Sequence, residues 1–521
     1  MKKVILTLSP ELAGNIKEVE HIARRKAKVD KARVVLTRRS IDARKHTVKI
    51  RLEALVGNDY DEGKHLNYRP ADKRVGDREP IIIVGSGPAG LFAAMRLIEL
   101  GIKPVILERG KDVQARRRDL ANINQKGVVN PNSNYCFGEG GAGTYSDGKL
   151  YTRSKKRGNV QRVLEILQYH GASEDILIDA HPHIGTNKLP KLIASIRQYI
   201  LDHGGEIHFE AKVDELILNG DEVVGVKANG TPYEGAAVLL ATGHSARDIY
   251  TLLAKQKIYL ERKPFAMGVR VEHPQTIIDR IQYHCQARGP YLPAAAYSLV
   301  SQVNYQGSVK GVFSFCMCPG GFIVPAATAP GEVVVNGMSP SRRDSKFANS
   351  GMVVALDEGE IAQQYGDSPL AYMKFQQAIE QAAFAAAGSS LAAPAQRLTD
   401  FVMKKVSATL PASSYEPGLA SLAMDELLPP FIAERLRLAF KHFGKKMPGY
   451  LTNEAVILGV ESRTSSPVRI PRNKETLEHV TLKRLFPAGE GAGYAGGIVS
   501  AAIDGEKCAE MAVRLYAEVK E

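Results

Sequence analysis

One stretch of the sequence decides the fold: it reads Ile81-Ile82-Ile83-Val84-Gly85-Ser86-Gly87-Pro88-Ala89-Gly90. Its first four residues are apolar and β-branched, which is typical of a parallel strand buried on both faces. The pattern G-x-G-x-x-G follows at once, and residues 91–100 then predict an amphipathic helix that ends at Gly101. A second apolar run at 104–107 completes a βαβ unit, and Glu108 follows it.

Each part of this unit has a chemical reason if it binds a dinucleotide. Gly85 permits the tight turn, Gly87 lets a pyrophosphate approach the backbone, and Gly90 lets the helix pack on the strand. The helix N-terminus offers free N–H groups and a partial positive charge. Glu108, 18 residues after Gly90, is expected to accept hydrogen bonds from ribose hydroxyls. The predicted contacts in this unit are Gly85, Ser86, Gly87, Pro88, Ala89, Gly90, Glu108 and Arg109.

The same glycine pattern occurs twice more, at 138–143 and at 491–496. A bare match is weak evidence, and only the first of the three has the strand, the helix and the acid in place. The last one follows an apolar run at 485–488 and precedes a predicted helix over 499–517. We therefore expect the three glycine clusters to serve a single nucleotide, not three.

Length and composition bound the class of protein. The chain has 521 residues, 44% hydrophobic and 24% charged, which predicts two or three globular domains. It contains no uncharged apolar stretch of membrane-spanning length, and five cysteines without a recognisable signal peptide favour the cytoplasm. Residues 1–75 carry 19 Lys and Arg against 10 Asp and Glu, so most of the net charge of +13 lies in this segment.

We predict three units along the chain. Residues 1–75 form a basic N-terminal βαββ module, and a polar stretch over 57–80 behaves as its linker. Residues 80–260 and 450–521 form the nucleotide-binding domain, and residues 262–449 form an inserted α+β substrate or cap domain. Within these units we expect helices over 159–171 and 188–203, hairpins at Asn219-Gly220 and Asn229-Gly230, sheet over 262–345 and mostly helix over 358–446.

Three features together resemble the glutathione-reductase-like FAD superfamily. They are the first glycine fingerprint, the strand end LLATG at 239–243, and the late glycine–acid pair Gly489-Glu490 before a glycine-rich helix start. A closer resemblance is to bacterial uncharacterised FAD-dependent, so-called NAD-utilising, dehydrogenases, and it covers nearly the whole chain. The matching segments are RSIDARK at 39–45, FGEGGAGTYSDGKL at 137–150, ATGHSARD at 241–248 and CMCPGG at 316–321.

The resemblance implies an α/β fold with a Rossmann-like FAD-binding domain of the glutathione-reductase type. It implies that Glu490, where Asp is usual, holds the ribityl or pyrophosphate part of FAD, and that Val213 lies at the adenine. The loop over 138–148 would follow the ribityl chain, and the last helix would point its N–H groups at the flavin ring. The further residues implied are Gly140, Gly141, Thr144, Ala241, Thr242, Gly243, Gly489, Gly496, Gly497 and Ile498.

Four residues are candidates for the chemistry itself. Alternation places Arg270 and Glu272 on one strand face, where they would clamp a substrate carboxylate and relay a proton; the alternative is an ordinary salt-bridged sheet face. His244 is a candidate general acid, and Arg463 a candidate over the flavin, with packing or a surface ion pair as the alternatives.

Two cysteines remain open at this stage. Cys316 and Cys318 share a strand face, so they are either a redox pair or small residues that pack near a pocket. No second Cys or His pair completes a tetrahedral metal set, so no metal is predicted.

The sequence thus predicts an FAD-dependent oxidoreductase, a dehydrogenase or reductase that passes hydride or electrons between a small-molecule substrate and non-covalently bound FAD. There is one nucleotide fold and no second one dedicated to NAD(P)H, so three sources of reducing equivalents stay open: the substrate, NAD(P)H that visits the flavin transiently, and a protein donor. One alternative is a flavoprotein that acts on nucleic acid through its basic module, in which Arg38, Arg39, Arg44 and Lys45 are predicted to form one dense basic loop. The module could equally dock on an acidic protein or on the protein's own cofactor domain. Another alternative is a non-catalytic FAD sensor.

Overall fold

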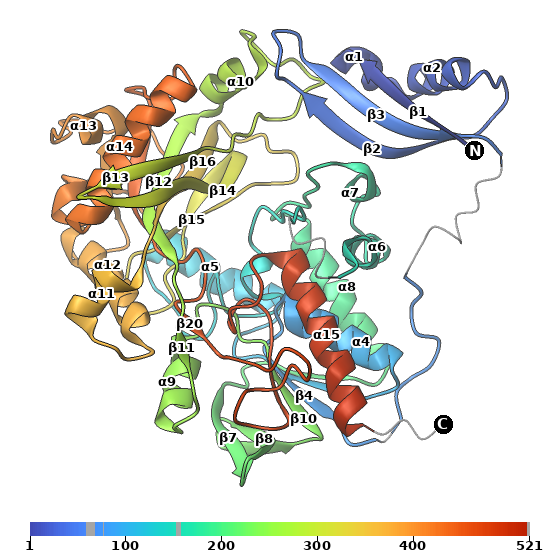
Figure 1. Cartoon of the computed structure of the whole chain (residues 1–521), viewed down its shortest axis with the longest axis vertical. Coiled ribbons are helices and arrows are strands. Elements are labelled where there is room, and N and C mark those ends of the chain that lie inside the picture. Colours follow the sequence, from blue (N-terminus) through green and yellow to red (C-terminus); the bar gives the residue numbers. More distant parts are fainter. Residues whose placement is uncertain (59–67, 77, 153–157, 518–521) are drawn as a thin grey trace.

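The computed structural model describes residues 1–58, 68–76, 78–152 and 158–517. Three sheets organise them: a small antiparallel sheet at the N-terminus, a parallel sheet, and a large mixed sheet. Figure 1 shows the N-terminal sheet in blue above the parallel sheet, with the mixed sheet beside both. The predicted linker over 57–80 lies in part outside the described residues.

The N-terminal module is a three-stranded sheet in the order β1-β3-β2 with two helices on one face. Its elements are β1 (Lys2–Leu8), α1 (Pro10–Ala13), α2 (Ile16–Ala27), β2 (Val34–Asp42) and β3 (Lys49–Val56). Alternate residues of β1 and β3, such as Leu6 and Leu52, pack against Val19 and Ala23 of α2. The predicted βαββ order is confirmed, with the short α1 added.

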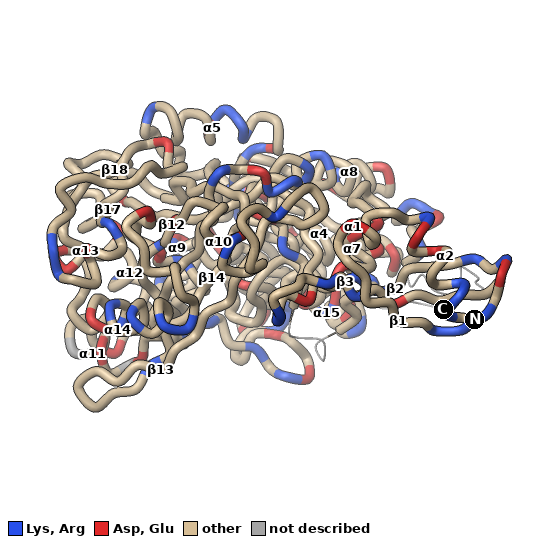
Figure 2. Tube along the Cα trace, turned by 90° about the horizontal axis from the view of Figure 1, so that it is seen from above, with Lys and Arg blue, Asp and Glu red and all other residues tan. Residues whose placement is uncertain are grey.

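This module docks on the rest of the chain through β2. The backbone oxygen of Arg39 accepts from the N–H of Ala180 at 2.9 Å, and its guanidinium donates to Asp179 at 2.7 Å and to Asp175 at 3.0 Å. The prediction of one dense basic loop is wrong, because Arg39 lies within β2 and is ion-paired with the neighbouring unit. Figure 2 shows acidic positions interspersed with basic ones along the module.

The parallel sheet has the strand order β21-β10-β4-β5-β6, and every pair in it is parallel. The strands are β4 (Ile81–Val84), β5 (Pro104–Leu107), β6 (Glu206–His208), β10 (Ala237–Leu240) and β21 (Leu485–Pro487). All of them except the edge strand β6 are apolar and buried, because both faces of the sheet are covered. The predicted βαβ unit over 81–108 is confirmed, with α4 (Pro88–Glu99) as its helix.

Helices cover one face of this sheet and an antiparallel ribbon covers the other. Ile81 and Ile83 pack with the helices α4, α5 (Val113–Lys126), α6 (Val160–Tyr169), α7 (Asp175–Ile178), α8 (Leu189–Asp202) and α15 (Ile498–Tyr516). Ile82 and Val84 pack with α9 (Arg247–Lys255) and with the ribbon β7 (Val213–Asn219), β8 (Glu222–Ala228) and β9 (Thr231–Glu234). Both predicted hairpins are confirmed, since Gly220 and Gly230 take positive φ at the two turns.

The mixed sheet runs in the order β13-β14-β16-β12-β19-β17-β18, and β15 pairs with β14. Its strands are β12 (Ala266–Pro274), β13 (Val300–Tyr305), β14 (Ser308–Pro325), β15 (Val335–Met338), β16 (Phe347–Ala355), β17 (Ala393–Arg397), β18 (Leu419–Ser421) and β19 (Val456–Glu461). Its helices are α10 (Gln275–Tyr283), α11 (Glu358–Tyr365), α12 (Ala371–Ala386), α13 (Leu398–Val402) and α14 (Pro430–Lys446). The short ribbon β11 (Glu261–Arg262) with β20 (Val468–Arg469) leads to and from this unit.

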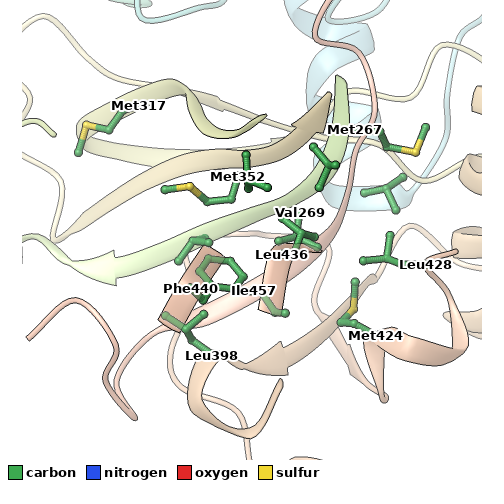
Figure 3. Packing of buried hydrophobic residues seen from close by; sticks show 14 of the residues in the cluster. Met267, Val269, Met317, Met352, Leu398, Met424, Leu428, Leu436, Phe440 and Ile457 are labelled. Atoms are coloured by element: carbon green, nitrogen blue, oxygen red, sulfur yellow. The ribbon is translucent and has the colours of Figure 1, made fainter. Parts of the chain in front are cut away.

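The mixed sheet and its helices share one apolar core. Figure 3 shows Val269 and Ile457 of the sheet packed with Leu436 and Phe440 of α14. Two sequence expectations need correction here. The predicted boundary at residue 449 is too early, because β19 pairs with β12 and β17. The stretch over 358–446 also contains β17 and β18 among its predicted helices.

Among the described residues, no helix is both long and apolar enough to cross a bilayer.

Candidate functional site

A cleft opens at the carboxyl edge of the parallel sheet, where β4 and β10 lie side by side. After β4 the chain builds the sheet through β5 to β6 on one side, and it places β10 and β21 on the other. Such a switch in direction leaves a crevice at the strand ends, where ligands of open α/β sheets bind. Predicted cofactor residues that line the cleft are Gly85, Gly87, Pro88, Ala89, Glu108, Arg109, Gly141, Val213, Ala241, Thr242, Gly243, Glu490, Gly497 and Ile498.

The first glycine turn has the geometry that the sequence predicts. Gly85 has φ +104°, and a Cβ there would lie 2.6 Å from the carbonyl oxygen of Ala241. A Cβ at Gly90 would lie 1.9 Å from the oxygen of Gly85, so only glycine lets α4 approach the turn. Gly87 differs from both, because a Cβ there meets no described atom within 4 Å. Its backbone faces the open cleft at the N-terminus of α4, which is the place for a phosphate.

Glu108 joins the first glycine turn to the second. Its carboxylate accepts hydrogen bonds from the N–H and hydroxyl of Ser86 and from the N–H groups of Gly110 and Gly138, all within 3.0 Å. The structure thus gives Glu108 and Ser86 a role in holding two loops together. The predicted contact of Glu108 with ribose hydroxyls stays a prediction.

The second glycine loop, over residues 138–143, is held by Arg116, whose side chain is fully buried on the side of the loop away from solvent. Its guanidinium donates to the backbone oxygens of Glu139 and Gly141 at 2.9 and 3.0 Å. Gly141 faces the cleft, whereas Gly140 and Thr144 support the loop: a Cβ at Gly140 would lie 1.9 Å from Oγ1 of Thr144.

The third glycine cluster brings the N-terminus of α15 to the cleft. Gly497 and Ile498 line it, so the first free N–H groups of this helix face the cavity. Two of the predicted residues lie behind this surface instead: Gly489 donates to Asp504 at 2.7 Å, and the N–H of Gly496 donates to Ser500 at 3.0 Å.

Two polar groups in the cleft are left for a ligand. Oγ1 of Thr242 is buried and has no hydrogen-bond partner among the described residues. Glu490 lines the cavity, and burial raises the pKa of its carboxyl to about 7, against the opposing charge of Lys263. At neutral pH this side chain therefore both donates and accepts hydrogen bonds in comparable populations.

Of the four catalytic candidates, the structure brings only His244 to the cleft. Its Nδ1 hydrogen-bonds to Oγ of Ser245 at 3.1 Å. Burial, helped by the charge of Arg463, lowers the pKa of His244 to about 4. The imidazole is thus neutral at pH 7, and its role as a general acid stays a prediction.

Arg463 belongs to a buried charge cluster instead of standing over the cleft. Its guanidinium donates to Glu380 at 2.9 Å and to Glu332 at 3.2 Å, and both carboxylates also pair with Arg247. The surface-pair alternative is equally wrong, since Arg463 is only 7% exposed.

Arg270 and Glu272 also lie outside the cleft lining. Arg270 is fully buried and donates to Glu461 at 2.7 Å and to Asn349 at 2.7 Å. Glu272 accepts from the N–H and hydroxyl of Ser414. The substrate-clamp prediction is wrong, because both side chains are buried and already have partners within the protein: Glu461 and Asn349 for Arg270, and Ser414 for Glu272.

The structure adds cleft residues that the sequence reasoning left without a role: Cys136, Phe137, Lys149, Lys212 and Asp248. Ser146 and Asp147 of the predicted ribityl loop and Cys316 also line the cleft. Arg109 shows how they act together: it donates to Asp248 at 2.7 Å and its guanidinium lies 4.1 Å from the ring centre of Phe137. The resemblance of residues 137–150 to the FAD-dependent dehydrogenases indicated that this segment belongs to the site, but the sequence pattern does not show which of its side chains face the cleft.

Comparison with known proteins bears on what fills this cleft. Residues 78–125 match a model described as an FAD binding domain, residues 264–464 match one described as FAD-dependent protein, C-terminal domain-like, and residues 1–57 match a domain of unknown function. An uncharacterised protein of Clostridium beijerinckii is 39% identical over 508 residues, which is 94% of each chain. The chain belongs to a family of FAD-dependent proteins. FAD is its cofactor, bound by a Rossmann-type fold.

More distant relatives share less of the chain. A thiamine thiazole synthase of Aeropyrum pernix is 27% identical over 158 residues, 30% of this chain and 46% of its own. The crystal structure of an L-proline dehydrogenase from P. horikoshii aligns with a TM-score of 0.35 at 12% identity, over 86% of this chain and 96% of its own.

The residues of the cleft fit FAD. Gly87 and the start of α4 leave room for a pyrophosphate, Thr242 offers an unpaired hydroxyl, and the N-terminus of α15 lies farther along the same cavity. FAD has a nucleotide at one end, a flavin at the other and a charged pyrophosphate between them, and these groups of the cleft can contact it along its length.

Proposed function

We propose that this protein is an FAD-dependent oxidoreductase that passes hydride or electrons between a small molecule and non-covalently bound FAD. The observation that supports this most is that Gly87 of the phosphate turn, the N-terminus of α15 and Cys316 of the mixed sheet all line one cleft. The cleft thus lies between the cofactor fold and a second unit, which is where ligand sites commonly occur. We also propose that the cofactor fold is of the glutathione-reductase type, on the residue pattern given above.

FAD, when bound, supplies the two-electron chemistry, and the chain supplies position and charge. The N–H groups at Gly497 and Ile498 would stabilise negative charge that develops next to them. Burial raises the pKa of Glu490 to about 7, so its carboxyl can carry a proton near neutral pH, whereas His244, with its pKa lowered to about 4, stays neutral there.

The test is anaerobic mixing of the holoprotein with NADH, NADPH and a panel of small organic acids. We expect at least one donor to bleach the flavin band at about 450 nm. If dithionite reduces the flavin but none of these donors does, the result contradicts the oxidoreductase proposal and favours a non-catalytic FAD sensor.

The nucleic-acid alternative has less support. Arg39 is used in docking the module, and Arg44 pairs with Asp42 of its own chain. RNA binding that weakens steeply above about 50 mM salt would reverse this ranking.

A further inference from the structure

A pair of cysteines borders the cleft on the side of the mixed sheet. Cys316 is half-buried and lines the cavity, whereas Cys318 lies behind it and is fully buried. Lys149, which also lines the cavity, places its Nζ 3.7 Å from the Sγ atoms of both cysteines. Three groups from two distant segments therefore converge at one point.

The backbone of β14 is distorted where the cysteines occur. Cys316 has φ +45°, a left-handed conformation that costs a non-glycine residue on the order of 1 kcal/mol. The register of β14 against β16 also shifts between Phe315 and Cys318. In a regular strand the two thiols would stand apart on one face, but here the thiol of Cys318 turns back and donates to the backbone oxygen of Cys316 at 3.3 Å.

The charges around the pair favour one thiolate. Lys149 is flanked by Asp147, which is in turn paired with Arg343 at 2.7 Å. The neighbouring thiol of Cys318, together with the positive charges of Lys149 and Arg270, lowers the pKa of Cys316, whereas the neighbouring Cys316 and burial raise the pKa of Cys318. A thiolate that borders the cleft, beside a protonated and fully buried thiol, is the arrangement of an attacking and a resolving cysteine.

A metal site is the competing explanation for paired cysteines. Among the described residues, however, no group of three or more His, Cys, Asp or Glu could hold a metal ion. The neighbour that completes the cluster is a lysine, which repels a cation and stabilises a thiolate.

We propose that Cys316 and Cys318 are a redox-active dithiol that exchanges two electrons with FAD in the cleft. Formation of the Cys316–Cys318 bond removes both thiol protons and two electrons; FAD takes the electrons and two protons and becomes FADH2, and the reverse reaction restores the dithiol. Lys149 is the positioning residue that keeps Cys316 ionised. The inference rests on the proposed function for the cofactor, since it needs FAD next to Cys316.

The first test counts electrons in the holoprotein after mild oxidation and removal of the oxidant. Anaerobic dithionite titration of the wild type should consume about four electrons per FAD, and that of Cys316→Ser or Cys318→Ser about two. Cys285→Ser is the matched control, because Cys285 is partly exposed but lies outside the cleft lining, and it should still consume about four. About two electrons per FAD in the wild type would overturn the proposal.

The second test needs neither a variant nor bound FAD. The oxidised protein, unfolded in an alkylating reagent and weighed by mass spectrometry, should carry three labels, and the reduced protein five, with Cys316 and Cys318 as the protected pair. Five labels in both states would contradict a disulfide at this site.

A third readout isolates Lys149. The alkylation rate of Cys316 should rise with pH at a midpoint about one unit higher in Lys149→Met than in wild type, and Lys149→Arg should restore it. Equal midpoints in all three proteins would show that Lys149 only packs there. These results are separable from the proposed function: if disulfide formation and the uptake of four electrons persist while no external donor bleaches the flavin, the dithiol stands and the oxidoreductase proposal falls.

Discussion

Two glycines of the first turn have different roles: Gly90 is needed for packing of the helix, and Gly87 for binding of the cofactor. A methyl at Gly90 would collide with the backbone of Gly85, whereas one at Gly87 would enter open space. We expect Gly90→Ala to lower the free energy of unfolding of the apoprotein by about 2 kcal/mol or more. Gly87→Ala should change it by less than about 1 kcal/mol but weaken FAD binding at least tenfold, since it occupies the place of a phosphate. Urea denaturation and flavin fluorescence titration measure the two effects; equal destabilisation by both variants would contradict this division.

Glu490 should give the apoprotein a distinct pH dependence. Its pKa is raised by burial to about 7 in the folded chain, so the unfolded chain ionises at lower pH. The stabilising contribution of the protonated form is therefore complete below about pH 4.5 and is lost as the pH rises towards 7. We expect the melting temperature of wild type to fall more between pH 5 and 8 than that of Glu490→Gln. Glu475→Gln, at an exposed position, is the control and should follow the wild type.

At the scale of elements, a buried charge cluster ties α9, α12 and the segment after β19 together. Glu380 of α12 is fully buried and pairs with both Arg247 and Arg463. Removing this carboxylate in Glu380→Ala leaves buried Arg463 and partly exposed Arg247 to share the single carboxylate of Glu332, and we expect a loss of about 3 kcal/mol in the free energy of unfolding. Asp367→Asn breaks the exposed pair with Arg262 and should cost less than about 1 kcal/mol. Similar losses from both variants would contradict a structural role for the cluster.

The unit from β4 to β5 could be predicted from the sequence, because its two apolar strands, its glycine turn and its helix follow one another within 28 residues and depend mainly on local patterns. Arg270 could not be placed, because its partner Glu461 lies 191 residues away and arrives only when β19 joins β12. The same applies to Lys149, which meets Cys316 across 167 residues. Local patterns predicted which face a side chain takes, but not what covers that face.

At the scale of the whole molecule, Arg39 fastens the N-terminal module to the cofactor domain. Its side chain reaches Asp175 and Asp179, next to α7. We expect Arg39→Ala to speed amide hydrogen exchange in β2 and around residue 180, while the flavin spectrum stays unchanged. Arg51→Ala, at a more exposed position on β3, should leave that exchange as it is. Unchanged exchange in Arg39→Ala would show that apolar contacts alone dock the module.

The central claim about the whole molecule is that one FAD fills the cleft along the carboxyl edge of the parallel sheet. The absorbance spectrum of the purified protein tests it most directly. We expect bands at about 370 and about 450 nm with close to one FAD per chain, and their loss in Gly87→Ala at limiting FAD. A colourless protein that cannot be reconstituted with added FAD would contradict the account.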